Sequence, residues 1–361
     1  MTASILLVGG GHAHIAALRW LMGNPRHSAS ITLVTPSAST VYSGMVPGFV
    51  AGHFKREDLE IDLLNLCAKA GVSLRLDRVV SFDPQNNECV GASGAKYQYD
   101  VVSVDVGIQS SPTDLPASSN AMPVKPLEAF VNHWDGLSPE LVKGVAIVGG
   151  GLGGIELAMA IRQKFKASHL PDMVPISLID RSQILSSSSP SLQRLLRRNL
   201  EALGIKVFES TTIAQLLPDK VILSSGLAVP AGQTLWAAGA FCQKWLLDSG
   251  LELKGVFPAV STSLQSASHE NVFVAGDAAQ IVDHQLPKAG VHAVKQGPIL
   301  MRNLMAYLSG HSLREYRPQA DYLKLVTLGS KSAAAEKWGL TLKFPGLWSL
   351  KKIIDQSFVN G

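Results

Sequence analysis

The stretch Ser4–Arg19, SILLVGGGHAHIAALR, decides the expected fold of this chain. Its apolar run Ile5–Val8 predicts a buried parallel strand, and three consecutive glycines separate that run from a segment of helical periodicity. A strand, a glycine turn and a helix in this order form an anion site, because the helix N-terminus offers free N–H groups and a partial positive charge. The stretch therefore predicts a Rossmann-like unit that holds the diphosphate of a nucleotide.

The chain repeats this arrangement at Val145–Ala160, VAIVGGGLGGIELAMA. Here Gly149, Gly151 and Gly154 complete the G-x-G-x-x-G spacing of dinucleotide-binding folds. Two such units in one chain predict two bound nucleotides. The fold class that follows is α/β, with two Rossmann-like dinucleotide-binding domains and a short C-terminal α+β segment.

The two units differ where the ribose of the nucleotide is expected. The second unit's next strand, Ile176–Ile179, ends in Asp180, whose carboxylate can accept from ribose hydroxyls and repels a 2′-phosphate. The positive charge of Arg181 would instead attract a 2′-phosphate, so the sequence favours NADH over NADPH only weakly. The first unit's strand, Ile31–Val34, is followed by Thr35 and Pro36 instead of an acid.

The first unit also has His14 where the third glycine of the spacing would stand. A histidine at a helix start can face solvent or backbone, or it can take part in catalysis. The first interpretation is favoured here, because a lone histidine at a helix start is more often structural than catalytic.

The composition describes a globular chain of 361 residues, with 46% apolar and 17% charged residues. The net charge of +4 includes no long basic run, which argues against nucleic-acid binding. The first strand begins almost at Met1, and no apolar run approaches the roughly 20 residues of a membrane-spanning helix. Three widely separated cysteines, Cys67, Cys89 and Cys242, suit free thiols in a cytosolic setting.

Further along the chain, Val41–His53 is rich in glycine and small residues. It is expected either to fold back over a cofactor or to be an ordinary surface connection. The other expected elements are a helix over Glu57–Ala70, strands over Ser73–Val80 and Lys96–Val106, a turn region over Asn86–Gly94, a linker over Ser110–Pro126, a helix from Pro190 to Gly204, and a hairpin around Pro218–Asp219.

A third apolar strand, within Glu270–Ala279, ends in Gly276 and Asp277. That aspartate can bind sugar hydroxyls or cap the next segment, and the sequence allows both. Pro287–Gln296 is expected to open a helix whose first amides face a ring that gains negative charge, and Pro298 is expected to kink or restart it.

The C-terminal residues predict strands over Tyr322–Leu328 and Thr341–Phe344 and a helix over Leu347–Phe358. In that helix Leu347, Leu350, Ile354 and Phe358 share one stripe, with Lys351, Lys352 and Asp355 elsewhere. This pattern is typical of an interfacial helix or of a helix packed on the core or on a second subunit.

The ordered motifs VGGGHAH, YSGMVPG, SVDVG, VGGGLGGIELA, LWAAG, VFVAGDAA and PKAGVHAVKQGP resemble the pyridine nucleotide-disulfide reductase superfamily. Within it, the chain is similar to type II NADH dehydrogenases and to the flavoprotein fused to the N-terminal side of selenide, water dikinase. The resemblance implies FAD in the first unit and NAD(P)H in the second. It also implies an FAD-binding domain in two parts (1–110 and 235–310), an NAD(P)H-binding domain (111–234) and a C-terminal segment (311–361) that is interfacial or dimerising.

The resemblance also assigns site residues. FAD is expected at Gly9, Gly11, His12, His14, Thr35, Pro36, Ser43, Gly44, Met45, Pro47, Val80, Gly107, Gly276, Asp277, Lys288, Ala289, Gly290 and Val291. NAD(P)H is expected at Gly149, Gly151, Leu152, Gly153, Gly154, Glu156, Asp180, Arg181 and Gly239. Lys288 and Gln296 are the candidate catalytic residues, the latter at a position near the quinone pocket of type II NADH dehydrogenases, and no metal site is expected.

No cysteine pair lies near the expected flavin site, so disulfide and polysulfide mechanisms are disfavoured. The leading hypothesis is an enzyme that passes a hydride from NAD(P)H to FAD and electrons on to a quinone-like acceptor. The alternatives are a flavoprotein of selenium or sulfur metabolism and a non-catalytic FAD-binding module. A cytoplasmic location is expected, either free or at the inner face of a membrane through residues 347–358.

Overall fold

A computed structural model describes residues 2–25, 28–110, 121–134, 143–168 and 174–361. Most of the expected linker over Ser110–Pro126 lies outside these residues. Contacts divide the chain into two compact units. The first comprises Met1–Thr40, Ile61–Ile108 and Phe241–Gln319, and the second comprises Val41–Glu60, Gln109–Ala240 and Ala320–Gly361.

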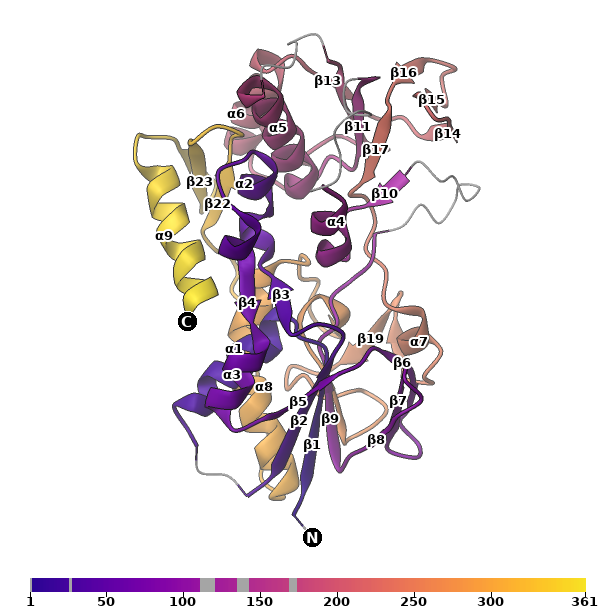
Figure 1. The fold of residues 1–361 in the computed structure, drawn as a ribbon, viewed down its shortest axis with the longest axis vertical. Coiled ribbons are helices and arrows are strands. Elements are labelled where there is room, and N and C mark those ends of the chain that lie inside the picture. The colour runs from indigo at the N-terminus through magenta and orange to yellow at the C-terminus, as the bar shows by residue number, and fades with distance from the viewer. Residues whose placement is uncertain (1, 26–27, 111–120, 135–142, 169–173) are drawn as a thin grey trace. The chain divides into compact units, whose positions relative to one another are not determined.

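The first unit is built on a parallel sheet of five strands (Figure 1). Across the sheet their order is β20 (Val272–Val274), β9 (Val101–Val104), β1 (Ser4–Val8), β2 (Ser30–Thr35) and β5 (Ser73–Leu76). Their near-continuous apolar sequence suits strands covered on both faces. Three helices pack together beside the sheet, namely α1 (His12–Met22), α3 (Leu63–Ala70) and α8 (Gly290–Leu308).

Helices α1 and α8 approach closely, because a Cβ on Gly297 would lie 2.5 Å from the carbonyl oxygen of Ala13. The first unit also holds an antiparallel sheet of β6 (Val79–Asp83), β7 (Glu88–Gly91) and β8 (Lys96–Gln98). Its remaining elements are α7 (Lys244–Leu247), β18 (Leu253–Lys254), β19 (Phe257–Val260), η4 (Gly276–Ala278) and β21 (Gln280–Ile281).

The second unit contains a second parallel sheet of the same kind. Its order is β10 (Ala121–Pro123), β17 (Gln233–Trp236), β11 (Val145–Val148), β12 (Ile176–Ile179) and β13 (Ile205–Phe208). Among its described residues, the helices of this unit are η1 (Ser43–Met45), α2 (Val46–Val50), η2 (Arg56–Leu59), α4 (Leu127–Trp134), α5 (Leu152–Ala167), α6 (Pro190–Ala202) and α9 (Leu347–Asn360). These two sheets confirm the predicted α/β class with Rossmann-like cores.

Two antiparallel sheets complete the second unit. One joins β14 (Ile213–Leu216), β15 (Lys220–Leu223) and β16 (Ala228–Pro230), which confirms the hairpin around Pro218–Asp219. The other joins β22 (Lys324–Thr327), β23 (Ala333–Lys337) and β24 (Leu340–Leu342), where the sequence predicted only the two outer strands. The short strands β3 (Ser39–Val41) and β4 (Glu60–Asp62) lie where the chain passes between units.

Several predicted elements have different bounds in the structure. The helix over Glu57–Ala70 is wrong in its first half, because the side chain of Asp62 accepts from the N–H of Asn65 and caps a helix that begins only at Leu63. The strand over Ser73–Val80 is two strands, β5 and β6, and the turn region Asn86–Gly94 contains the central strand β7. Val41–His53, predicted as a loop, forms η1 and α2.

The expected start of α8 is wrong, and of the two outcomes expected at Pro298, a kink or a restart, the restart does not occur. The helix begins at Gly290 instead of near Pro287, with Ala289 at its N-cap. It continues through Pro298 to Leu308 without a restart. A single proline removes one helical hydrogen bond, and the packing of α8 on α1 offsets that loss.

Candidate functional site

The first glycine turn follows β1 and leads into α1. Gly9 has φ +94°, and a Cβ there would lie 2.4 Å from the carbonyl oxygen of Asp105. The N–H of Gly9 donates to the carbonyl of Val34, and the N–H of Gly11 donates to the carbonyl of Asp105. Only glycine fits this position, since the backbone of β9 passes directly beside it. The predicted strand, glycine turn and helix are therefore present at residues 4–22.

Asp105, at the end of β9, is a site residue that the sequence reasoning missed. Its carboxylate Oδ2 accepts from the N–H groups of Ala13 and His14, 2.8 and 3.1 Å away, at the start of α1. Burial raises the pKa of this carboxyl to about 7, against the hydrogen bonds that favour its charged form. The available signal was an acid at the carboxyl end of a central strand, within the motif SVDVG.

His14 is fully buried and faces the protein interior. Its Nδ1 donates to the carbonyl of Gly9 at 2.6 Å, and its Nε2 lies 2.8 Å from the hydroxyl of Ser103. Burial lowers the pKa of His14 to about 4, so the ring is neutral near pH 7. The histidine thus fixes the glycine turn on β9, in agreement with the interpretation that it faces backbone.

The segment Gly276–Asp277 follows β20 at the same edge of the sheet as Gly9. Gly276 has φ +64°, and its N–H donates to Oε1 of Gln296 at 2.7 Å. Gln296 is buried in α8, so the structure gives this candidate a role in holding the Gly276 turn. A Cβ on Gly276 would lie 2.5 Å from Oδ1 of Asp105, and a Cβ on Gly11 would also meet this carboxylate. The first glycine turn and the Gly276 turn therefore both lie beside Asp105.

Lys288 lies just before α8. Its Nζ donates to the carbonyl of Ala279 at 2.7 Å and lies 3.7 Å from the centre of the Phe257 ring. Thr35 is buried at the end of β2, whereas Val80 on β6 is exposed. The other residues assigned to FAD are placed as follows: His12 opens α1, Pro36 follows β2, Gly107 follows β9, Val291 is in the first turn of α8, and Ser43, Gly44, Met45 and Pro47 lie in η1 and α2 of the second unit.

The second glycine turn follows β11 and leads into α5. Gly149 has φ +118°, and a Cβ on it would lie 2.8 Å from the backbone nitrogen of Ala238. A Cβ on Gly154 would lie 2.0 Å from the carbonyl oxygen of Gly149, so helix and turn are in close contact. A Cβ on Gly151, in contrast, would meet no atom within 4 Å. The turn thus leaves open space in front of the start of α5, where a diphosphate would bind.

Two acids follow neighbouring strands of the second sheet. Asp180, after β12, accepts from the N–H of Gly150 at 2.5 Å and from the N–H and hydroxyl of Ser182. Glu209, after β13, forms a bidentate ion pair with Arg197 at 2.6 and 2.8 Å. Hydrogen bonds from Arg197 lower the pKa of Glu209. Arg181 is exposed, and Gly239 follows β17 with φ +75°.

Glu156 belongs to a second polar group within this unit. Its Oε1 accepts from the N–H and the hydroxyl of Thr327 at 2.7 and 2.6 Å. Desolvation raises the pKa of Glu156, while the positive charge of Lys351 opposes the shift. Lys351 pairs with Asp355 at 2.6 Å and donates to the carbonyl of Gly44 at 2.8 Å. Glu156 therefore lies in an interior network.

The three cysteines are free and buried. Burial raises the pKa of the Cys67 thiol to about 11, of Cys89 to about 12 and of Cys242 to about 11. Such thiols carry almost no reactive thiolate near neutral pH.

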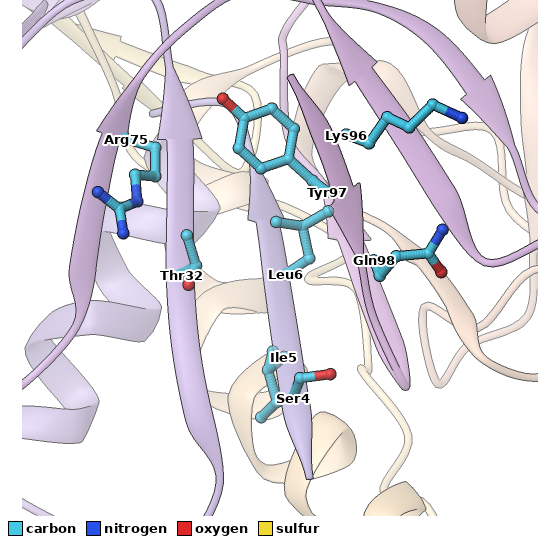
Figure 2. Close-up of a pocket in the computed structure, with 8 residues that line it drawn as sticks. All are labelled: Ser4, Ile5, Leu6, Thr32, Arg75, Lys96, Tyr97 and Gln98. Carbon is cyan, nitrogen blue, oxygen red and sulfur yellow. The ribbon is translucent and has the colours of Figure 1, made fainter. Parts of the chain in front are cut away.

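A small pocket lies elsewhere in the first unit (Figure 2). Its lining includes Arg75 from β5, Thr32 from β2 and Leu6 from β1, with Tyr97 from β8. Cofactors of open α/β sheets bind outside the carboxyl ends of the strands. Leu6 and Thr32 pair with each other in the middle of β1 and β2, before the carboxyl ends of these strands, so this pocket is separate from the expected nucleotide site.

The residues present fit the two expected nucleotides. The second turn offers an open helix start with an acid after the next strand. The first offers a glycine turn that leads into a helix, with the N–H groups of Ala13 and His14 held by Asp105. Among the described residues, no group of three or more His, Cys, Asp or Glu side chains could hold a metal ion. No helix within the described ranges is both long and apolar enough to cross a membrane.

Comparisons with known proteins agree with this geometry. The family model described as pyridine nucleotide-disulphide oxidoreductase matches residues 3–297. The NADH dehydrogenase-like protein YutJ of Bacillus subtilis is 22% identical over 324 residues, covering 87% of this chain and 86% of that protein. The demethylphylloquinone reductase NdbB of Synechocystis is 26% identical over 220 residues, covering 58% of this chain and 52% of that protein. The structure of the sulfide:quinone oxidoreductase from Aquifex aeolicus has a TM-score of 0.83 at 18% identity, covering 98% of this chain and 90% of that chain.

Proposed function

The chain belongs to the pyridine nucleotide-disulphide oxidoreductase family, and from this premise we propose that it is an FAD-dependent NAD(P)H:quinone-type oxidoreductase with NADH as its favoured donor. A flavin, when bound, takes two electrons from a nicotinamide and passes them on to an acceptor. The protein's own residues then have to bind the two nucleotides and choose the donor.

The observation that carries this proposal is the second glycine turn. The open space in front of Gly151 and the start of α5 suit a diphosphate, because the helix N-terminus presents N–H groups and partial positive charge. Asp180 follows the next strand, so a 2′-phosphate at the end of that strand would meet a carboxylate. This charge pattern supports NADH over NADPH.

In the first unit Gly9, Gly11 and His12 would hold the diphosphate of FAD, with Asp277 after β20 for its ribityl hydroxyls. Asp105 already accepts from two N–H groups at the start of α1, and burial raises its pKa to about 7, which favours its neutral form. A neutral carboxyl can donate a hydrogen bond to a phosphate oxygen instead of repelling it.

The proposal also specifies the class of electron acceptor, a quinone-like molecule. The three cysteines are free, buried thiols, which supports electron transfer without a redox-active disulfide. Two similar proteins have names that include NADH dehydrogenase and demethylphylloquinone reductase. A small planar acceptor that reacts directly with flavin suits both observations.

Anaerobic reduction of the purified yellow protein tests the donor half. NADH is expected to bleach the flavin faster than NADPH, and a soluble quinone is expected to restore the colour. A Gly154→Ala variant should lower the bleaching rate at least tenfold, because its methyl group would overlap the carbonyl of Gly149. Gly23→Ala is the matched control, since a Cβ there makes an ordinary 3.6 Å contact at the end of α1.

Bound FAD without bleaching by either nicotinamide would contradict the proposal and favour a non-catalytic module. If a nicotinamide bleaches the flavin and selenium or sulfur species, but not quinones, then take up the electrons, the proposed quinone-like acceptor is wrong and the proposed donor stands.

A further inference from the structure

One face of the five-stranded sheet in the first unit carries Leu6, Thr32 and Arg75. Leu6 pairs with Thr32 across β1 and β2, and Thr32 pairs with Ser73 across β2 and β5. Side chains of paired residues in a parallel sheet project from the same face, and side chains two positions apart in a strand do so as well. Arg75 therefore shares the face of Leu6 and Thr32, which changes from apolar to polar toward the outer strand β5.

Strand β8 passes over this face, and the two form a pocket of about 210 Å³ (Figure 2). Tyr97, in the middle of β8, projects toward the sheet, and its ring lies above Leu6 in the view of Figure 2. Leu6 is only 3% exposed, so the floor beneath the ring is apolar. An apolar cavity of roughly 150 Å³ can bind benzene. The pocket therefore has room for one aromatic ring with a small substituent.

The Tyr97 ring is held in place by an acid. Its hydroxyl donates to Oδ2 of Asp77 at 2.9 Å, and the same carboxylate accepts from the N–H and the hydroxyl of Ser93. Tyr97 is thus a fixed wall of the pocket, and the negative charge of Asp77 is already met by these donors.

Among the described residues, two cations line the pocket, and they differ in what they contact. Nζ of Lys96 lies 3.1 Å from Oε1 of Glu88. Arg75 has no carboxylate within ion-pair distance in the part of the chain that the structure describes. Figure 2 shows Arg75 and Thr32 on one side of the Tyr97 ring and Lys96 on the other. Arg75 is therefore the cation available to an anionic ligand.

We propose that this pocket binds a small aromatic carboxylate. The ring of the ligand lies between Leu6 and Tyr97, because the flat surface of a sheet and a phenol ring suit a planar group. The carboxylate accepts from the fork of N–H groups of Arg75, and the Thr32 hydroxyl supplies a further donor. An inorganic anion would reach Arg75 and leave the apolar floor uncovered. The inference goes beyond the proposed redox function and does not depend on it.

Titration of the purified flavoprotein with benzoate, followed by NMR on the benzoate resonances, tests the proposal. Saturable binding is expected with a Kd on the order of 1 mM, as befits a ligand of this size. Benzamide has the ring without the charge, and acetate has the charge without the ring. Each is expected to bind about tenfold more weakly than benzoate, because it makes only one of the two contacts.

Variants locate the bound benzoate. Arg75→Gln should weaken its binding about tenfold, and Thr32→Val should weaken it about threefold. Arg317→Gln removes another exposed arginine of the same unit and is the matched control that should leave binding unchanged. Since Arg75 is exposed, its variant is expected to keep the parent's circular dichroism spectrum and flavin absorbance.

Three results would overturn the proposal. The first is the absence of saturable benzoate binding, and the second is equal binding of benzoate and benzamide. The third is equal benzoate binding by the parent and Arg75→Gln, which would leave Arg75 as a charge that protects an edge strand from pairing. If that third result came with a benzoate-induced shift of the flavin absorbance, the benzoate would be bound at the flavin instead.

Discussion

The stability of α1 should depend on pH through two buried groups that act in opposite directions. Asp105 has a pKa of about 7 in the folded protein against 3.8 for an exposed aspartate. Its folded form therefore holds a proton that the unfolded form loses, and stability falls as the pH rises between these values. The difference of roughly 3 pKa units corresponds to about 4 kcal/mol.

His14 has a pKa of about 4 against 6.5 for an exposed histidine. The unfolded form binds the extra proton here, so stability rises with pH across that window, by about 3 kcal/mol for roughly 2.5 units. Between pH 4 and 6.5 the two contributions nearly cancel. The parent is expected to show a flat profile of stability against pH from these two groups. A variant that lacks one group should show the slope that the remaining group contributes.

Asp105→Asn keeps an acceptor for the N–H of Ala13, and His14→Asn keeps a donor for the carbonyl of Gly9. In the first variant the opening free energy of α1 should rise with pH from 4 to 6.5, and in the second it should fall. Hydrogen exchange of α1 amides in the cofactor-free protein, corrected for the intrinsic pH dependence, measures this energy. Glu315→Gln, an exposed acid of the same unit, is the control that should keep the parent profile.

Parallel profiles for the parent and both single variants would refute the reasoning. So would slopes of the same sign in Asp105→Asn and His14→Asn. The double variant is expected to return to a flat profile, because neither titrating group remains.

Three other predictions follow from single contacts. Lys351→Met should lower the free energy of unfolding by about 3–5 kcal/mol in urea titrations, because it leaves Asp355 buried without its partner, and Lys351→Met with Asp355→Leu should regain most of the loss. Asp180→Asn should raise kcat/KM for NADPH relative to NADH about tenfold in steady-state assays, and an unchanged ratio would show that this acid does not select the donor. Asn303→Leu should lower the melting temperature, with a loss of about 2–4 kcal/mol, because Asn303 bonds the backbone of Ser263 and Arg314 from a fully buried position. Asn303→Asp should lose at least as much, because a carboxylate cannot donate to the two carbonyls that Nδ2 contacts.

The sequence by itself determined the two Rossmann-like cores. An apolar run, a glycine turn and a helical period are local features, and the backbone needs glycine at Gly9 and Gly149 whatever surrounds them. The helix opened by Pro190 was equally readable, because a proline at the first helical position acts locally, and the structure adds Ser189 as its cap.

Only the tertiary structure decided what the turns contact and which face of an element is buried. Asp105 lies 92 positions along the chain from Ala13, so no local pattern could show that its carboxylate caps α1. The rotation of α9 is set by Gly44 and Tyr42, more than 300 positions away, and these contacts override the hydrophobic period that the helix carries. Periodicity shows that a helix has two faces, whereas the choice between them is made by the partners that burial brings together.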